Sequence, residues 1–417
     1  MTRFNTNRKR RIPTWLLCGL PLALAACDSA ADPAATLRVD SAGIPITTAL
    51  APVWDPGDEW TIVEEPVVQI GSVDGPSEYV LGGVARTVRL GKGDIVLGDW
   101  TSGVLRRYDR EGVFMWEVSG QGEGPGEHRR LNWVGALASD SIVTWDGPLR
   151  RIQIFGPDGL VGRTMRVEAP WADFLPTGVQ GIWRRNLVMS FADYRGEMPE
   201  GVVRWPGYRL ATVSLDDGAV ARLIDVPGGE QEITRYPGGG WANTGYQYGK
   251  RPLFTVQTGT LALVDTEAFS IRSISLDDGS TSRILRSDKP IVPVTEEHVE
   301  AFLDWMVWRN QVWGGMSEEA AEARRPIWRD LPMAPTLPVL SAIHLDAAGN
   351  LWVRPYSLPR AESLPYEVYA PDGTWLGNVA TPPGLSLEDG EIGEDYVLGV
   401  WMDEQDVEYV RVHRLEK

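Results

Sequence analysis

Short apolar runs of about five residues recur along this chain, each followed at a similar distance by a second run and a turn. The first runs begin at Ile95, Ile142, Leu187, Leu261, Leu351 and Val397. Their partners end in turns such as DREG, GPDG and LDDG, which suit tight hairpins. Because β-branched and aromatic residues alternate in these runs, the pattern predicts strands rather than helices.

The spacing of these copies predicts the architecture. Successive starts differ by 47, 45, 74, 90 and 46 residues, so a unit of about 46 residues is kept in three intervals and enlarged in two. A period of this size with several strands per unit is typical of a propeller blade. We therefore expect an all-β fold, a six-bladed β-propeller of four-stranded blades. In the first blade the strands should span about 84–90, 95–100, 104–109 and 113–118.

The last copy is incomplete, because the chain ends at Lys417 after its third strand. Residues 60–71 with the segment after them, WTIVEEPVVQIG then SVDGPSEY, resemble MWEVSG followed by QGEGPGEH in the first unit. We expect the N-terminal strand at 60–70 to pair with 407–415 and close the ring, since an open sheet edge is a liability. This makes residues 50–417 one propeller domain.

A helical insertion is expected at about 295–331, between the fourth and fifth blades. Thr295 suits a helix N-cap, and an apolar stripe follows it; a second helix should start at Ser317 and end before Pro326. Such helices could form a lid over the ring mouth. The tryptophans of this segment would then face a ligand, or else pack against their own scaffold: Trp305, Trp308, Trp313 and Trp328.

The N-terminus has the pattern of an export signal. Four basic residues at 8–11 precede an apolar stretch too short to span a membrane stably, and Leu24-Ala25-Ala26-Cys27 resembles a lipobox. We expect residues 1–26 to be a lipoprotein signal peptide, Cys27 to be lipidated, and residues 27–49 to form a linker. The alternative is an ordinary cleaved signal in which Cys27 is incidental. Either reading predicts an exported protein of the cell envelope, periplasmic or surface-side.

Charge and cysteine content exclude several functions. The chain has 40 basic and 57 acidic residues; without residues 1–26, which hold five basic and no acidic ones, the net charge is about −22. Nucleic acid is therefore an improbable partner, and a membrane should be held only through the lipid. Both cysteines, Cys18 and Cys27, lie in or beside the signal, which leaves no disulfide. The four histidines are scattered singly along the chain, which argues against a zinc cluster.

The chain resembles the bacterial six-bladed β-propeller lipoproteins related to NHL-repeat proteins. The resemblance rests on residues 39–44, on YDREGVF with GQGEGPGEH, on DAAGNLWVR, and on the terminal DYVLGVWMDEQDVEYVRVHRL. It implies the fold and an envelope location, and it supplies no reaction for named residues. An NHL-like aspartate closes the second strand at Asp99, Asp146 and Asp265, whereas Phe191, Pro355 and Trp401 hold that position in the other units.

Long connections single out one face. The insertions at 191–209, 225–252, 289–338 and 356–365 all join strands two and three or successive blades, which emerge on the same side of an antiparallel blade. Loops on a rigid scaffold are common binding sites, although neutral growth is the alternative. With the helical Trp305, Trp308 and Trp313, the ligand-binding candidates are aromatic and acidic residues taken to lie near that face: Asp99, Trp100, Trp145, Asp146, Trp183, Asp265, Trp401 and Asp403.

These residues also admit structural roles, since aromatics pack blades together and aspartates tie down turns. We expect a non-catalytic protein that binds a ligand or an envelope protein on the loop-rich face, with no cofactor. A metal-assisted hydrolase or lactonase is the alternative, with calcium at the central channel and Asp99, Asp146 and Asp265 as weak ligand candidates. An envelope scaffold is a third possibility. Three or more oxygens converging at the channel would favour the metal enzyme.

Overall fold

The computed structural model describes residues 35–118, 120–194, 200–236, 238–243, 245–361 and 363–417. The expected signal peptide, 1–26, and the lipidation site, Cys27, lie outside the described residues and stay predictions. Residues 35–417 form one compact unit. None of the helices in the described part of the chain is long and apolar enough to cross a membrane.

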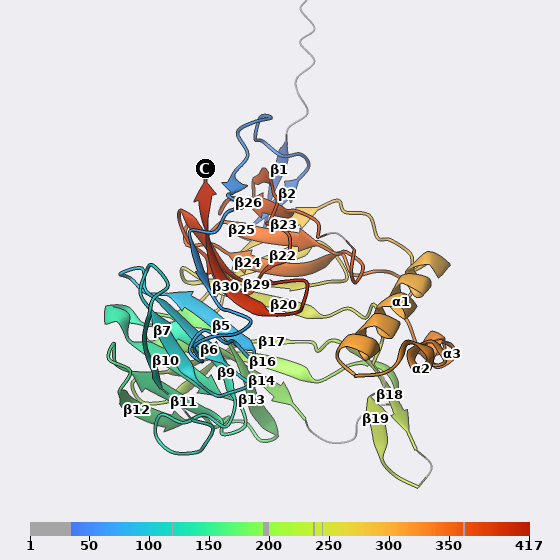
Figure 1. Cartoon of the computed structure of the whole chain (residues 1–417). Helices are drawn as coiled ribbons and strands as arrows, with labels where there is room; N and C mark the ends of the chain where they lie inside the picture. The colour runs from blue at the N-terminus through green and yellow to red at the C-terminus, as the bar shows by residue number, and fades with distance from the viewer. Residues whose placement is uncertain (1–34, 119, 195–199, 237, 244, 362) are drawn as a thin grey trace, which may run out of the picture. The chain divides into compact units, whose positions relative to one another are not determined.

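Antiparallel four-stranded sheets dominate this unit (Figure 1). The first sheet is β5 (Val84–Arg89), β6 (Ile95–Asp99), β7 (Leu105–Tyr108) and β8 (Phe114–Val118), close to the predicted bounds. The second is β9 (Leu131–Ala136), β10 (Ile142–Asp146), β11 (Arg151–Phe155) and β12 (Val161–Arg166). The third is β13 (Phe174–Trp183), β14 (Asn186–Asp193), β16 (Gly207–Ser214) and β17 (Val220–Val226).

The remaining sheets repeat this order. They are β20 (Pro252–Gln257), β21 (Thr260–Asp265), β22 (Ser270–Ser275) and β23 (Thr281–Ser287), then β24 (Leu340–Leu345), β25 (Leu351–Pro355), β26 (Tyr366–Tyr369) and β27 (Trp375–Val379), and finally β28 (Leu385–Ile392), β29 (Tyr396–Met402) and β30 (Glu408–Glu416). The first strands contact one another in the order β5, β9, β13, β20, β24 and β28, and β28 contacts β5 again. This arrangement is consistent with a β-propeller.

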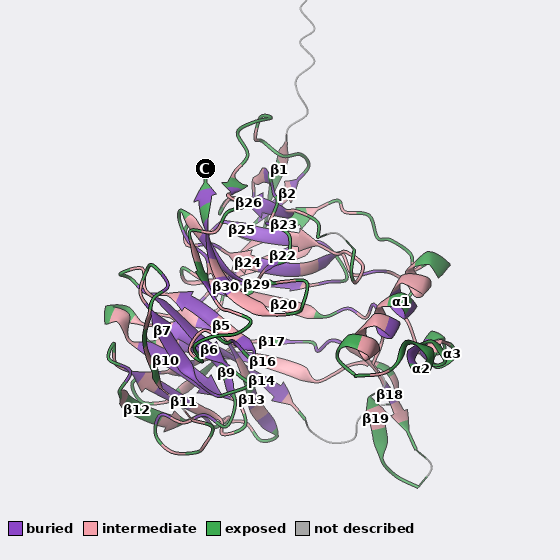
Figure 2. Ribbon diagram, in the orientation of Figure 1, coloured by how far each residue is buried: buried purple, intermediate pink, exposed green. Residues whose placement is uncertain are grey.

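The core is divided between successive sheets. One buried cluster, which includes Trp145 and Phe191, joins the second sheet to the third, and another, around Val353 and Tyr369, joins the fourth to the fifth. Figure 2 shows this burial concentrated in the sheet strands. The second strands of the first two sheets are buried on both faces, since all five residues of β6 and of β10 are buried.

The N-terminal segment completes the last sheet, as predicted. Two short strands, β3 (Thr61–Ile62) and β4 (Val68–Ile70), pair antiparallel with β30. Val68, Gln69 and Ile70 lie opposite residues 412, 411 and 410. Ile70 is fully buried between the last sheet and the first.

The prediction that residues 27–49 form a linker is wrong from Thr36 onward. Here β1 (Thr36–Ser41) and β2 (Ile44–Ala49) form a hairpin, and β2 runs parallel to β23 at the outer edge of the fourth sheet. The turn is made by Ala42 and Gly43, both with positive φ, which is the conformation of a tight two-residue hairpin turn.

The connections on the insertion-bearing side contain further structure. Helices α1 (Glu296–Val312), α2 (Glu318–Glu322) and α3 (Arg325–Arg329) follow β23. Pro326 lies in the first turn of α3 rather than beyond a helix end, where its missing N–H costs nothing. A small separate sheet forms from β15 (Gly201–Arg204), β18 (Glu230–Arg235) and β19 (Trp241–Asn243), in segments expected to be loops.

Candidate functional site

The aspartates that close the second strands are used by the backbone. Asp99 accepts hydrogen bonds from the amides of Gly82, Thr101 and Ser102 at 2.8–2.9 Å. Asp146 accepts from the amides of Arg129 and Leu149 at 2.7 and 3.2 Å. Both carboxylates are buried, so their lone pairs fix turns, in the Asx-type role considered above.

Asp265 and Asp403 are likewise engaged. Asp265 accepts from the Glu267 amide and pairs with Arg204. Asp403 accepts from the amides of Gln405 and Val407, and these hydrogen bonds lower the pKa of its carboxyl. In the part of the chain that the structure describes, no three His, Cys, Asp or Glu side chains converge where they could hold a metal ion. Asp99, Asp146 and Asp265 are therefore not brought together as a calcium site.

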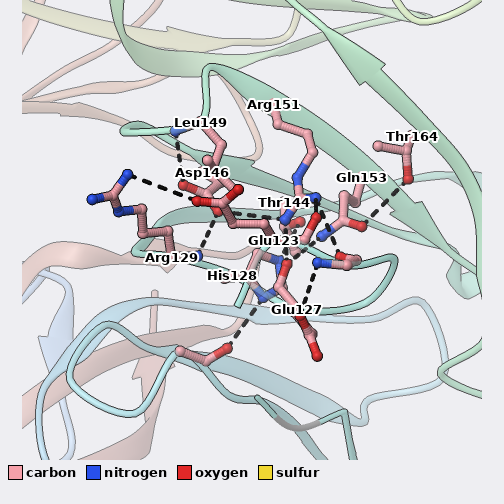
Figure 3. Close-up of polar contacts among 12 residues, drawn as sticks. Glu123, Glu127, His128, Arg129, Thr144, Asp146, Leu149, Arg151, Gln153 and Thr164 are labelled. Atoms are coloured by element: carbon pink, nitrogen blue, oxygen red, sulfur yellow. Dashed lines mark hydrogen bonds and ion pairs between the residues drawn. The ribbon is translucent and has the colours of Figure 1, made fainter. Parts of the chain in front are cut away.

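The glycine-rich turn at 120–127 is a structural junction between the first and second sheets (Figure 3). Arg151 donates to the carbonyls of Glu123, Gly124 and Glu127, and Gln153 accepts from the Gly126 amide. The fully buried His128 places Nδ1 3.1 Å from the Gly103 carbonyl and Nε2 2.9 Å from the Thr144 hydroxyl. These side chains hold the backbone of the turn, which indicates scaffolding, although the buried Nε of Arg151 has no hydrogen-bond partner.

The candidate tryptophans of the sheets do not share one surface. Trp145 is fully buried, whereas Trp100 is 44% exposed beneath the Arg130 guanidinium, and Trp401 packs under Arg411 at 3.4 Å. Trp183 does not lie on the loop-rich face where it was expected. It ends the first strand β13, at the hairpin to β14, whereas Trp100 follows the second strand β6. The antiparallel topology puts these two positions at opposite ends of a sheet.

The tryptophans of the helical segment mostly pack on it. Trp328 is buried, and Trp305 packs against the same cluster as Phe302 and Tyr248. Trp308 contacts Trp313 edge-on, with ring centroids 5.5 Å apart, and Trp313 is 65% exposed. None of the residues from 295–331 lines the central cavity described next, so the structure lends no support to a lid whose tryptophans face a ligand there.

A cavity of about 620 Å³ lies among the first strands of the six sheets. Each strand contributes lining residues: Arg86, Val88 and Arg89 from β5; Trp133, Gly135 and Ala136 from β9; Val179, Gln180, Gly181 and Ile182 from β13; Leu253–Gln257 from β20; Ser341–Leu345 from β24; and Glu388–Ile392 from β28. The volume falls in the range of small-molecule sites. Its lining mixes apolar side chains with several charged ones.

Arg86 is the least compensated of these charges. Its Nε is buried without a hydrogen-bond partner, and its guanidinium lies 5.5 Å from the centre of the Trp133 ring. Burial lowers the pKa of Arg86, while Glu391 and Asp389 oppose this. No carboxylate among the described residues forms an ion pair with it. Arg86 as a whole is half-buried, but its Nε donor is shielded from solvent and has no acceptor among the described residues.

The acidic residues of the cavity wall come from β28, an irregular strand that contacts β5. β28 pairs with β29 at Ser386–Val400 and again at Glu391–Leu398, so residues 387–390 bulge past the single residue Gly399. Gly390 and Gly399 permit this, because a Cβ on Gly390 would lie 1.9 Å from the Leu398 carbonyl oxygen. The bulge carries Glu388 and Asp389 into the cavity wall. The Asp389 side chain is exposed, and partial desolvation at the bulge raises the pKa of its carboxyl to about 6.

Other polar groups of the wall have partners. Glu391 accepts from the Tyr396 hydroxyl at 2.6 Å and from the Arg89 amide at 3.0 Å; burial is the main cause that raises its pKa. The Arg89 guanidinium lies 4.4 Å from the centre of the Tyr396 ring. His344 contacts the Tyr366 hydroxyl, and burial lowers its pKa to about 3, so it is neutral at pH 7.

No family model and no curated protein matches this chain. Among solved structures it is similar to a member of the DUF4221 family from Bacteroides vulgatus, at 12% identity over 86% of this chain and 98% of the other, with a TM-score of 0.51. It is also similar to a Bacteroides fragilis protein thought to be exported (11% identity, 89% and 100% coverage, TM-score 0.47) and to a Xanthomonas campestris gluconolactonase (11%, 85% and 99%, 0.41). At 12% identity, the likeness to the DUF4221 member shows a shared fold and establishes no activity.

Proposed function

We propose that this protein is an exported, lipid-anchored six-bladed β-propeller that binds a small polar ligand in its central cavity without transforming it. The closed order of contacts among β5, β9, β13, β20, β24 and β28 supports six blades, with β3 and β4 completing the last sheet. Export and the anchor rest on the basic, apolar and lipobox residues up to Cys27.

The observation that carries the binding role is the unpaired Arg86 guanidinium in the cavity wall. Burying the Nε donor without an acceptor costs free energy, which a ligand that supplies the acceptor would recover. The loop-rich face is a weaker candidate for the binding site, because its candidate aspartates already accept hydrogen bonds from the backbone of turns. We therefore place the principal site in the cavity and move it from the face expected from the sequence.

The test is to fill the cavity. Gln257→Trp adds bulk to the wall at the end of β20, and Gln405→Trp adds the same side chain at an exposed loop as a matched control. Small carboxylic acids, amines, amino acids and sugars are screened by thermal shift, since a ligand bound only by the native state raises the melting temperature. A compound that stabilises the parent and Gln405→Trp, and not Gln257→Trp, supports the cavity. Equal stabilisation of all three proteins contradicts it.

A further inference from the structure

Two opposite charges in the cavity wall are left without direct partners. Arg86 on β5 and Asp389 in the β28 bulge attract each other, and the Coulomb effect of each on the pKa of the other has the expected sign. Yet no hydrogen bond or ion pair joins either side chain to another group in the described chain. Both line the cavity, Arg86 half-buried and Asp389 exposed, without forming an ion pair.

The neighbouring charges are already engaged. Glu388, beside Asp389, pairs with Arg354 at 3.2 Å. Arg251 donates to the Ser341 carbonyl at 3.4 Å. Arg89 lies over the Tyr396 ring and donates to the Gly93 carbonyl, and Glu391 accepts from the Tyr396 hydroxyl. Among the charged residues of the described wall, Arg86 and Asp389 have no hydrogen bond or ion pair to the protein.

The cavity wall also carries apolar side chains. Trp133, Ile182, Phe254 and Ile343 line the same cavity. Such a wall accommodates an organic body and lowers the local dielectric constant, which strengthens interactions with the two charges. A bare inorganic anion would satisfy Arg86 and leave Asp389 without a partner.

Building on the proposed function, we propose that the cavity ligand is a zwitterion of the α-amino acid type, whose carboxylate binds the Arg86 guanidinium and whose ammonium group binds the Asp389 carboxylate. The planar guanidinium suits a carboxylate, which it can bind through two parallel N–H donors. The Asp389 carboxylate accepts from the ammonium group, and both protein charges are neutralised in one event.

The experiment is isothermal titration of the twenty L-amino acids into the described domain with its native N-terminal segment from residue 28. For the tightest binder, the acid lacking the amine, the amine lacking the carboxylate and the corresponding hydroxy acid are titrated next. The variants are Arg86→Gln and Asp389→Asn, with Arg166→Gln and Glu404→Gln as controls that make the same charge changes at exposed positions.

We expect the amino acid to bind at least about tenfold tighter than either analogue that lacks one charge, since each charged contact contributes at least about 1.4 kcal/mol. Arg86→Gln should remove the preference over the amine, and Asp389→Asn the preference over the acid. The exposed controls should bind like the parent. Because both residues are unpaired, these variants should melt at or above the parent temperature, which separates lost binding from lost folding.

Two outcomes overturn this ligand class and leave the cavity function standing. One is that a compound of another class binds and is blocked by Gln257→Trp, while no amino acid binds. The other is that an amino acid binds with unchanged selectivity in Arg86→Gln and Asp389→Asn and is still blocked by Gln257→Trp. If no compound is blocked by Gln257→Trp, the proposed function falls as well.

Discussion

Protonation of His128 should make the junction between the first two sheets sensitive to acid. The ring is fully buried, Nδ1 donates to the Gly103 carbonyl, and Nε2 accepts from the Thr144 hydroxyl, which is the hydrogen-bonding pattern of a neutral imidazole. Burial lowers its pKa from 6.5 to about 4. The folded state therefore resists taking up the proton that the unfolded chain accepts.

The size and sign of the effect follow from linkage. Between pH 6.5 and 4 the unfolded chain binds more protons at this site than the folded one, so stability falls as the pH falls through that window. A pKa lowered from 6.5 to about 4 corresponds to about 3 kcal/mol of stability, present in full above pH 6.5 and lost by about pH 4. That is a large fraction of the stability of an ordinary domain.

The assay compares urea unfolding of the parent and His128→Gln at intervals from pH 7.5 to 4. Gln is uncharged throughout, so its stability curve should lose about 3 kcal/mol less than the parent curve over this range. The difference between the two slopes is the measurement, because lost hydrogen bonds offset the variant equally at every pH. Parallel curves would refute the assignment of a neutral, buried His128.

Three further predictions concern closure, the insertion and the anchor. Ile70→Ala should lower the free energy of unfolding by about 2–5 kcal/mol, because Ile70 is fully buried in the strand that completes the last sheet; unchanged urea unfolding would contradict it. Replacing residues 295–331 by a short Gly/Ser linker should leave one cooperative melting transition by circular dichroism and unchanged cavity binding; unfolding would make the helices core structure. Cys27→Ser should move the protein from the membrane to the soluble fraction in cell fractionation, and retention in the membrane would exclude lipidation.

Strand positions could be predicted from sequence because both the period-2 pattern and the 46-residue repeat are local signals. The pairing of residues 60–70 with 407–415 could also be predicted, since a missing strand in the last unit demands a partner. The hairpin at 36–49 was missed because its φ-positive Ala42 has no strong turn signature. The third helix was missed because Pro326 can start a helix as well as end one.

The cavity site depends on contacts that no local pattern contains. Arg86 and Asp389 are 303 positions apart and meet only because β28 contacts β5. One sequence signal was present: Glu388-Asp389-Gly390 interrupts a strand with two acids and a glycine, a pattern that indicates a bulge. The aspartates predicted as site residues were chosen because they recur in the repeat. A residue that recurs in this way stabilises the turn of its own unit and does not contribute to one shared site.

A crystal structure of the domain soaked with the tightest-binding amino acid tests the central claim most directly. The account predicts density in the cavity among the first strands, with the ligand carboxylate within hydrogen-bonding distance of the Arg86 guanidinium and its amine within that distance of the Asp389 carboxylate. Density on the loop-rich face near Trp100 or Trp401, with an empty cavity, would contradict it.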